Sequence, residues 1–258
     1  MNRLQLTGSE SRKNLIISLA TALLLSSASA REWHINPETG SDDNEGTAEA
    51  PLVTAQVAVN RAESGDVIHL HPENALYRQS ITLNKGQTGL TLEGNGVTLT
   101  GADPLKVEWE SLSENLQRVK LPTPQWGRHL LVVNGKKVHM NRRSVHPKEF
   151  PPVEELKDGE FRWDDIDDKE GWLTLKGSTE NLEWSVRPNG IGTGGNLSDI
   201  TVRNLNARHF LNDGFNIHGN ARALYFENIT GYENFDEGFS AHDTCEAWIK
   251  DSRFWKNE

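Results

Sequence analysis

The sequence predicts an all-β fold in which the chain winds as a parallel β-helix with turns of about 24 residues. Short alternating apolar segments, separated by Gly and Asn, follow one another closely over residues 67–100, as strands do. Near the C-terminus, Asp213-Gly-Phe-Asn-Ile-His218 recurs as Glu237-Gly-Phe-Ser-Ala-His242, because 213 + 24 = 237. A fixed period in the twenties with strand-like alternation indicates stacked repeats, and this period fits one turn of a parallel β-helix.

Residues 1–30 predict a secretory signal peptide. Basic residues precede an apolar run over residues 15–25, and Ala28-Ser29-Ala30 fits a small-x-small cleavage site. The alternative is an uncleaved anchor, but the run is shorter than the ~20 apolar residues that a spanning helix needs. We therefore expect a secreted or periplasmic protein with no membrane contact after cleavage.

The charge balance and the cysteine count narrow the function classes. The chain carries 37 acidic and 27 basic side chains, a net charge of −10, which argues against a nucleic-acid partner. Its one cysteine, Cys245, cannot form an intrachain disulfide. We interpret Cys245 as a small core residue and not as a nucleophile.

Residues 31–104 predict the first part of the stack. The polar loop over residues 37–46 carries Asp and Asn oxygens that could bind calcium, but an Asx-rich surface turn is the favoured interpretation. An apolar face between Pro51 and the stop at residues 64–66 predicts one short amphipathic helix. Strands are expected at 33–36, 67–70, 80–83, 90–92 and 97–100.

Residues 105–189 differ in composition from the segments on either side and predict an inserted β-rich subdomain. Residues 190–258 then continue the stack. Five of the eight tryptophans fall in this insertion. Asn134-Gly135 between two apolar segments predicts a hairpin over residues 130–138, and residues 172–176 alternate as a strand. The acidic cluster at Asp164, Asp165, Asp167 and Asp168 is interpreted as a solvated loop and not as a metal site.

Residues 46–51, 56–60 and 62–66 resemble the N-terminal cap of secreted right-handed parallel β-helix proteins of the pectin-lyase-like superfamily. Residues 77–83 and 200–204 fit the same pattern, so the resemblance covers roughly 31–104 and 190–258. It implies a right-handed β-helix with a short N-terminal capping helix and a polysaccharide partner. The segment 105–189 is similar to the β-rich insertion of some glycosidases in this superfamily, which also includes lyases, epimerases and adhesins.

The repeated motif supplies the candidate catalytic residues Asp213, Glu237 and Asp236. If turns stack about 4.8 Å apart, the carboxyl groups of Asp213 and Glu237 lie about 5 Å apart, the separation found in retaining glycosidases. Repulsion would raise the pKa of one of them and keep it protonated. Asp236 beside Glu237 resembles the paired acids of polygalacturonases, although only part of that motif is present.

Alternation along the strands predicts which neighbours line the site. Phe215 and Ile217, like Phe239 and Ala241 one repeat later, should point into the core. Outward polar rows should be formed by Asn216 and Ser240 and by His218 and His242, and Asn216, His218 and His242 are expected to contact substrate. An Asx-Gly turn ladder without catalysis is the competing interpretation of the whole motif.

The predicted function is that of a glycoside hydrolase acting on polysaccharide. A calcium-assisted polysaccharide lyase and a non-catalytic carbohydrate-binding β-helix stay open as alternatives. No cofactor is predicted, except that calcium could bind through Asp213, Asp236, Glu237 or Asp243. Lys250 and Arg253 are the nearest basic residues for a lyase. Because the last repeat stops in mid-turn, we also expect the chain to be part of a longer protein.

Overall fold

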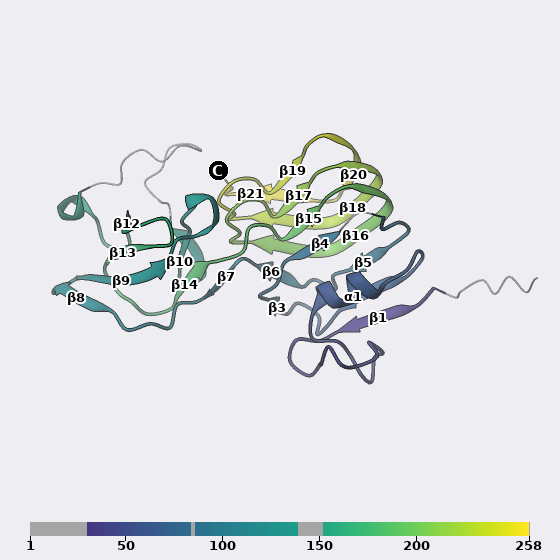
Figure 1. The fold of residues 1–258 in the computed structure, drawn as a ribbon, viewed down its shortest axis with the longest axis horizontal. Coiled ribbons are helices and arrows are strands. Elements are labelled where there is room, and N and C mark those ends of the chain that lie inside the picture. The colour runs from purple at the N-terminus through teal and green to yellow at the C-terminus, as the bar shows by residue number, and fades with distance from the viewer. Residues whose placement is uncertain (1–29, 84–85, 139–151, 258) are drawn as a thin grey trace, which may run out of the picture.

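The computed structural model describes residues 30–83, 86–138 and 152–257, so the predicted signal peptide before Ala30 lies outside the described residues. The described chain consists mainly of β-strands, and the short helix expected after Pro51 is present as α1 (Ala55–Arg61). The all-β prediction is therefore confirmed. Within the part of the chain that is described, no helix has the length and apolar character needed to cross a membrane. Figure 1 shows a body of stacked strands on one side and a smaller β-sheet body, coloured teal, on the other.

The main sheet is parallel and joins strands from both ends of the chain (Figure 1). Its central path runs through β1 (Glu32–Ile35), β2 (Val67–Leu70), β5 (Thr91–Glu93), β16 (Asn196–Arg208), β18 (Asn220–Tyr232) and β20 (Thr244–Lys250). Beside this path, β3 (Leu76–Tyr77) pairs with β6 (Thr98–Thr100), β6 pairs with β16, and β21 (Arg253–Trp255) pairs with β18. A second parallel sheet contains β4 (Ile81–Leu83), β15 (Ile191–Thr193), β17 (Phe215–Ile217) and β19 (Phe239–Ala241).

The sequence repeat corresponds to one layer of this stack. Ile191 pairs with Phe215, and Phe215 pairs with Phe239, so each residue lies beside its equivalent in the next repeat. Asn196 pairs with Asn220 at the same offset in the main sheet. Each layer buries its alternate apolar side chains, such as Phe215 and Ile217, which have no exposed surface. The predicted core positions Phe215 and Ile217 are therefore correct, whereas Phe239 is only partly buried and Ala241 is exposed, because one more layer on the stack is needed to cover them.

The chain leaves the stack after β6 and returns to it at β15. Ile81 pairs with Ile191, although the chain between these two neighbours is far longer than one repeat. The segment from β7 to β14 accounts for the extra length and forms two antiparallel four-stranded sheets. One consists of β7 (Ala102–Pro104), β10 (Leu131–Val133), β11 (Lys136–Val138) and β14 (Leu182–Ser185), and the other of β8 (Glu110–Ser113), β9 (Leu116–Pro122), β12 (Phe161–Asp165) and β13 (Glu170–Lys176). Two 3₁₀ turns, Gln125–Gly127 and Val153–Glu155, complete the segment.

The predicted Asn-Gly hairpin joins β10 to β11. These strands pair antiparallel, and both Asn134 (φ 51°) and Gly135 (φ 74°) adopt the left-handed conformation that a tight hairpin turn requires.

Two acidic segments make hydrogen bonds within the chain. The carboxylate of Asp42 accepts from the backbone N–H of Thr54 at 3.0 Å and from its hydroxyl at 2.6 Å, in agreement with the interpretation of residues 37–46 as a structural loop. Asp165 accepts from the indole N–H of Trp163 at 2.7 Å. Asp164 and Asp165 lie in β12, where they pair with β13, so the prediction of a loop is wrong for these two residues and only Asp167 and Asp168 lie between the strands.

Candidate active site

Two stacked loops bring the predicted carboxylates together. Residues 209–214 connect β16 to β17, and residues 233–238 make the same connection one layer later, between β18 and β19. The loops are joined by backbone hydrogen bonds from Gly214 N–H to the Glu237 carbonyl at 3.0 Å and from Asp236 N–H to the Asn212 carbonyl at 3.1 Å. We call Asp213, Asp236 and Glu237 the acidic corner.

Asp213 is the buried member of the acidic corner, with 3% of its surface exposed. Its Oδ1 accepts the backbone N–H of Glu237 at 3.0 Å. Its Oδ2 accepts from the hydroxyl of Ser240 at 2.5 Å and from the side-chain amide of Asn212 at 2.9 Å. Burial raises the pKa of Asp213, although these hydrogen bonds favour the charged form. Asp213 thus caps the loop of the next layer.

Asp236 and Glu237 are the accessible members of the acidic corner. The Asp236 side chain is 30% exposed, and its Oδ2 lies 3.0 Å from Nη2 of Arg128. Glu237 is exposed. Its pKa is raised, first by the partial burial of its carboxyl group and then by the negative charges of Asp213 and Asp236. One carboxylate is thus paired with a cation, whereas the pKa of another is raised.

Arg128 reaches the acidic corner from the antiparallel part of the chain, and Trp126 lies beside it. The Arg128 guanidinium donates to Asn212 Oδ1 and lies 5.6 Å from the centre of the Trp126 ring. Trp126 is 57% exposed and has a φ of 59°, which a bulky residue rarely adopts. Such strain is often found at functional sites. Both residues escaped the sequence analysis because they lie outside the repeat, where Pro124 and Gly127 signal only a turn.

Asn189 is a further residue that sequence reasoning missed. Its Oδ1 accepts from the backbone N–H of Asp213 at 3.2 Å and from the side-chain amide of Asn216, also at 3.2 Å. Asn216 is consequently only 8% exposed and does not join an outward polar row. Ser240, one layer on, is 4% exposed because it is bonded to Asp213. The simple alternation rule cannot foresee a side chain from a neighbouring loop that covers the outer face.

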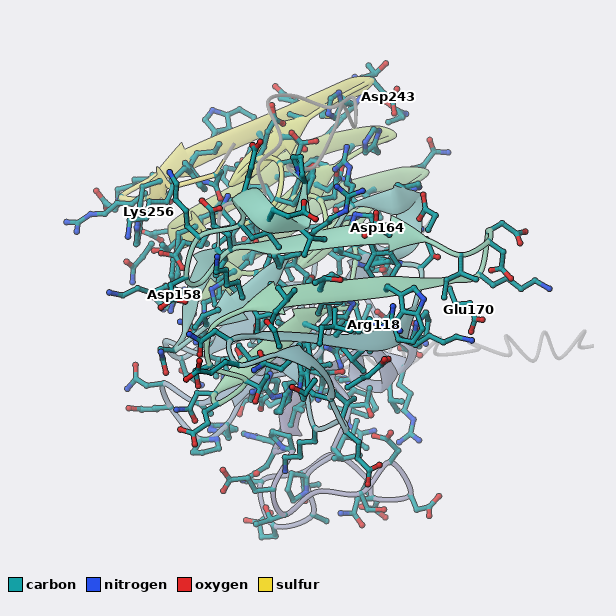
Figure 2. The ribbon with its side chains drawn as sticks, turned by 90° about the vertical axis from the view of Figure 1, so that its left-hand side faces the viewer. Arg118, Asp158, Asp164, Glu170, Asp243 and Lys256 are labelled. Carbon is teal, nitrogen blue, oxygen red and sulfur yellow. The ribbon has the colours of Figure 1, made fainter. Side chains whose placement is uncertain are left out.

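His218 and His242 stack as expected, with ring centres 4.6 Å apart. Nδ1 of His218 lies 3.2 Å from Oδ2 of Asp243, at the start of β20. Figure 2 shows Asp243 and Lys256 at opposite ends of the C-terminal strands. The three-residue strands β17 and β19, at ~3.3 Å per residue, separate His218 and His242 from the loops that carry the acidic corner. The structure therefore places the histidine pair further along the same face, where the charge of His242 still acts to lower the pKa of Glu237.

Lys250, one of the basic residues considered for a lyase, forms an ion pair elsewhere. Nζ of Lys250 pairs with Glu227 at 2.9 Å between β20 and β18.

Cys245 is partly buried, and burial raises the pKa of its thiol. Over the described ranges, no group of three or more His, Cys, Asp or Glu side chains is spaced to hold a metal ion.

Comparison with solved structures shows that this arrangement of strands occurs elsewhere. The structure described as the complex of XylC with xylose has a TM-score of 0.59 at 13% identity, covering 85% of this chain and 53% of that chain. The chain thus spans about half the length of that protein. A structure described as a glycoside hydrolase has a TM-score of 0.49 at 12% identity, covering 81% of this chain and 64% of that chain. The GH136 lacto-N-biosidase from Eubacterium ramulus has a TM-score of 0.36 at 12% identity and covers 86% and 31%, respectively.

At this level of identity, the likeness to XylC shows a shared fold. No family profile matches the sequence. No curated protein matches it either.

Proposed function

We propose that the protein is an exported glycoside hydrolase whose catalytic carboxylates lie in the acidic corner. In this proposal, the stack is a right-handed parallel β-helix that begins with a cap at residues 31–104, and residues 105–189 form an inserted subdomain. Residues 190–258 continue the helix. The fold match to XylC, whose structure holds xylose, supports this assignment.

One observation carries the proposal. Arg128 extends from the insertion to the acidic corner, where it pairs with Asp236, and the strained, exposed Trp126 lies beside Arg128. Carboxyl groups with different environments are what glycoside hydrolysis needs, because one must donate a proton while another stays ionised. The exposed Trp126 indole next to Arg128 offers a flat apolar face on which sugar rings stack.

The environments of the three carboxyl groups indicate which role each has in the proposed reaction. Glu237, with its raised pKa, donates a proton to the glycosidic oxygen as the bond to the anomeric carbon breaks. Asp236, ion-paired with Arg128, is the ionised partner that attacks the anomeric carbon or takes a proton from the attacking water. Asp213 holds the Glu237 backbone from beneath. The pairing of Asp213 directly with Glu237 is the alternative that the experiments must separate.

The substrate in this proposal is a neutral glycan. A net charge of −10 disfavours a polyanionic chain. Trp126 provides the stacking face, and the solvent-accessible His218 and His242 contact more distant sugar units. Asn216 acts indirectly, by holding Asn189.

A screen of the full chain against neutral and acidic polysaccharides tests the reaction class. We expect new reducing ends with a neutral glycan and no ultraviolet absorbance from unsaturated ends. Unsaturated ends would show a lyase instead, and retention on the glycan without products would show a binding protein.

Three variants test the roles once a substrate is known. Glu237→Gln should lower kcat by about 10²- to 10⁴-fold, the usual contribution of a general acid. Glu246→Gln, an exposed residue on β20, is the matched control and should keep full activity. Azide should restore turnover, with a glycosyl azide product, to the Ala variant of the nucleophile. Rescue of Asp236→Ala supports our assignment, whereas rescue of Asp213→Ala alone would transfer the nucleophile's role to Asp213.

Asp213 also supports a second candidate function. All the hydrogen bonds that its carboxylate accepts come from its own layer and the next one, as expected for a purely structural turn ladder. Unchanged glycan retention by the Glu237→Gln variant, together with no turnover by the parent chain, would establish a non-catalytic glycan-binding protein.

A further inference from the structure

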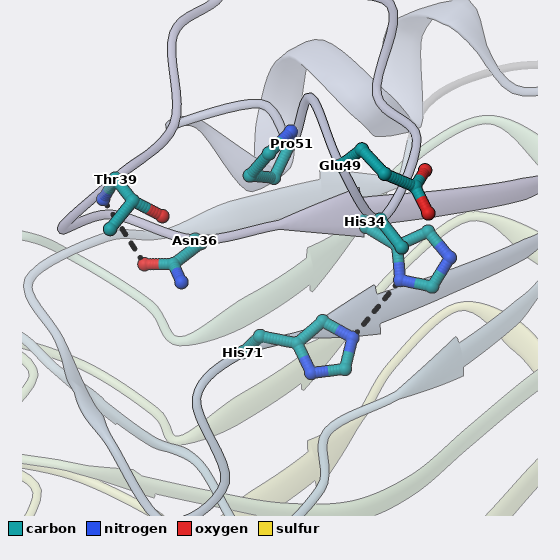
Figure 3. A pocket seen from close by; sticks show the side chains of 7 residues that line it. His34, Asn36, Thr39, Glu49, Pro51 and His71 are labelled. Atoms are coloured by element: carbon teal, nitrogen blue, oxygen red, sulfur yellow. Dashed lines mark hydrogen bonds between the residues drawn. The ribbon is translucent and has the colours of Figure 1, made fainter.

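A cavity of about 430 Å³ lies at the N-terminal end of the stack, on elements separate from the acidic corner (Figure 3). Its walls come from β1, from the loop that follows β1, and from the residue after β2. The lining residues are His34, Asn36, Thr39, Ala48, Glu49, Pro51 and His71. The proposed hydrolysis uses none of them.

Two imidazole rings converge in this cavity. Nδ1 of His34 and Nε2 of His71 are joined by a hydrogen bond of 3.1 Å, and a metal ion bound by both nitrogens would displace the proton that they share (Figure 3). With metal–nitrogen bonds of 2.0–2.1 Å, two nitrogens on a tetrahedral zinc ion lie about 3.4 Å apart. The pair is therefore a few tenths of an ångström from the separation that an ion between the two rings requires.

The backbone holds both histidines in place. His34 donates its N–H to the Gly46 carbonyl at 2.8 Å, and its carbonyl accepts the N–H of Leu52 at 2.9 Å. His71 donates its N–H to the Ile35 carbonyl at 2.8 Å, and its carbonyl accepts the buried hydroxyl of Tyr77 at 2.6 Å. Little ordering would accompany binding, which favours affinity.

The surrounding charges suit a cation. Oε2 of Glu32 lies 3.9 Å from Nε2 of His34, on the side of the ring facing away from His71. At this distance the carboxylate acts through its charge and not through a hydrogen bond, and it favours a positive ion at the ring pair. Glu49 adds a second negative charge to the cavity wall.

A third histidine supports the ring of His34. The His69 ring stacks on it with centres 5.1 Å apart. His69 pairs with His34 across β1 and β2, so the two side chains lie on the same face of the sheet. This stacking limits the rotation of His34 and keeps Nδ1 directed at His71.

We propose that His34 and His71 together bind one divalent transition-metal ion, with zinc as the reference ion and water in the remaining positions. Imidazole nitrogens suit zinc, copper and nickel. The bound ion links β1 to the end of β2 and therefore stabilises the N-terminal layer. The chain has a single cysteine, so no intrachain disulfide can supply such a link.

Calorimetric titration of the tag-free chain with zinc chloride tests the site. We expect one zinc ion per chain, and a higher melting temperature with zinc, because an ion that binds only the folded state stabilises it. His34→Gln and His71→Gln should each abolish both effects, whereas His242→Gln, in the other histidine stack, should leave them unchanged. Absence of saturable binding in the parent chain would overturn the proposal, as would loss of binding in His242→Gln with retention in His71→Gln.

A spectroscopic measurement on the parent chain is independent of variant folding. Electron paramagnetic resonance of the copper-loaded chain, at one copper ion per chain, should show hyperfine coupling to two imidazole nitrogens. Coupling to one nitrogen or to none would contradict the two-histidine site.

Discussion

Asp213 and Asp236 belong to equivalent loops of neighbouring layers, yet their carboxylates are in different environments. Asp213 is 3% exposed and accepts hydrogen bonds from Ser240, Asn212 and the Glu237 backbone. Asp236 is partly exposed and pairs with Arg128. Position in a repeat therefore does not determine the role of an acidic residue, because the neighbours above it and beside it differ.

Replacing Asp213 by Ala should destabilise the protein by about 1–3 kcal/mol, since donors in a buried site lose their acceptor. Chemical denaturation at neutral pH measures this free energy of unfolding. Glu246→Ala, at an exposed position, should change it by less than about 0.5 kcal/mol. Equal effects of the two substitutions would show that the Asp213 hydrogen bonds add no net stability.

His209, the first residue of the loop that carries Asp213, makes the stability of the fold depend on pH. Its ring is fully buried, and Nε2 lies 3.2 Å from Oε2 of Glu233. Burial is the main cause that lowers the pKa of His209 from 6.5 to about 4, with the positive charge of Arg208 adding to it, although Glu233 opposes the shift. The unfolded chain thus takes up a proton at a higher pH than the folded chain does.

This difference predicts a loss of stability in acid. The contribution of neutral His209 is fully present above pH 6.5 and falls as the pH drops toward about 4, by about 3 kcal/mol in total. Denaturation curves across this range should be less pH-dependent for His209→Gln, whose side chain does not titrate. His242→Gln should retain the dependence of the parent chain. Parallel pH profiles for all three proteins would contradict the assignment.

A column of glycines allows the layers to approach closely where the second parallel sheet begins. Gly190, Gly214 and Gly238 occupy equivalent positions in three successive repeats. A Cβ on Gly190 would lie 2.5 Å from the Gly214 carbonyl oxygen, and a Cβ on Gly214 would lie 2.8 Å from that of Gly238. Backbone atoms block the space at both positions, so the repeat requires glycine there for steric reasons.

Gly214→Ala should therefore destabilise the fold by about 1–3 kcal/mol through overpacking. Gly194→Ala is the matched control, because a Cβ there has no neighbour within 4 Å. Thermal unfolding of both variants measures the difference. A melting temperature of Gly214→Ala equal to that of Gly194→Ala would show that the layers can separate without cost.

Sequence patterns predict the elements of this molecule better than they predict its site. Alternation and turn residues locate β2 and the β10–β11 hairpin, because both signals are local. The period of the repeat predicts the parallel register. Neither pattern predicts the role of Arg128, because its contact with Asp236 exists only once the chain has folded back onto the stack. Neither predicts the role of Asn189, which lies in another loop and covers Asn216.

The two bodies of the molecule share part of a hydrophobic core. Leu211 and Phe235 belong to loops of the stack but pack in the same buried cluster as Trp163 and Trp184 of the antiparallel sheets. Leu211 has no exposed surface. The shared cluster couples the stability of the two bodies, so we expect a single cooperative unfolding transition.

Leu211→Ala should cost about 2–5 kcal/mol, as other buried leucine truncations do, and should broaden or split the calorimetric transition. Leu112→Ala, at a position with 42% of its surface exposed in the antiparallel part, should leave one transition at nearly the parent temperature. Two separate transitions in the parent chain would show that the bodies unfold independently.

The connections between paired strands differ in length, and this difference affects folding kinetics. A long stretch of chain separates Ile81 from its partner Ile191, whereas a short one separates Ile191 from Phe215. Closing the longer loop costs about 1.3 kcal/mol more chain entropy than closing the shorter one. Contacts of high sequence separation form slowly. Ile68 and Leu92 in the N-terminal layers are as close in sequence as Ile191 and Phe215, so we expect each group of layers to form its own contacts first and the two groups to dock on each other last.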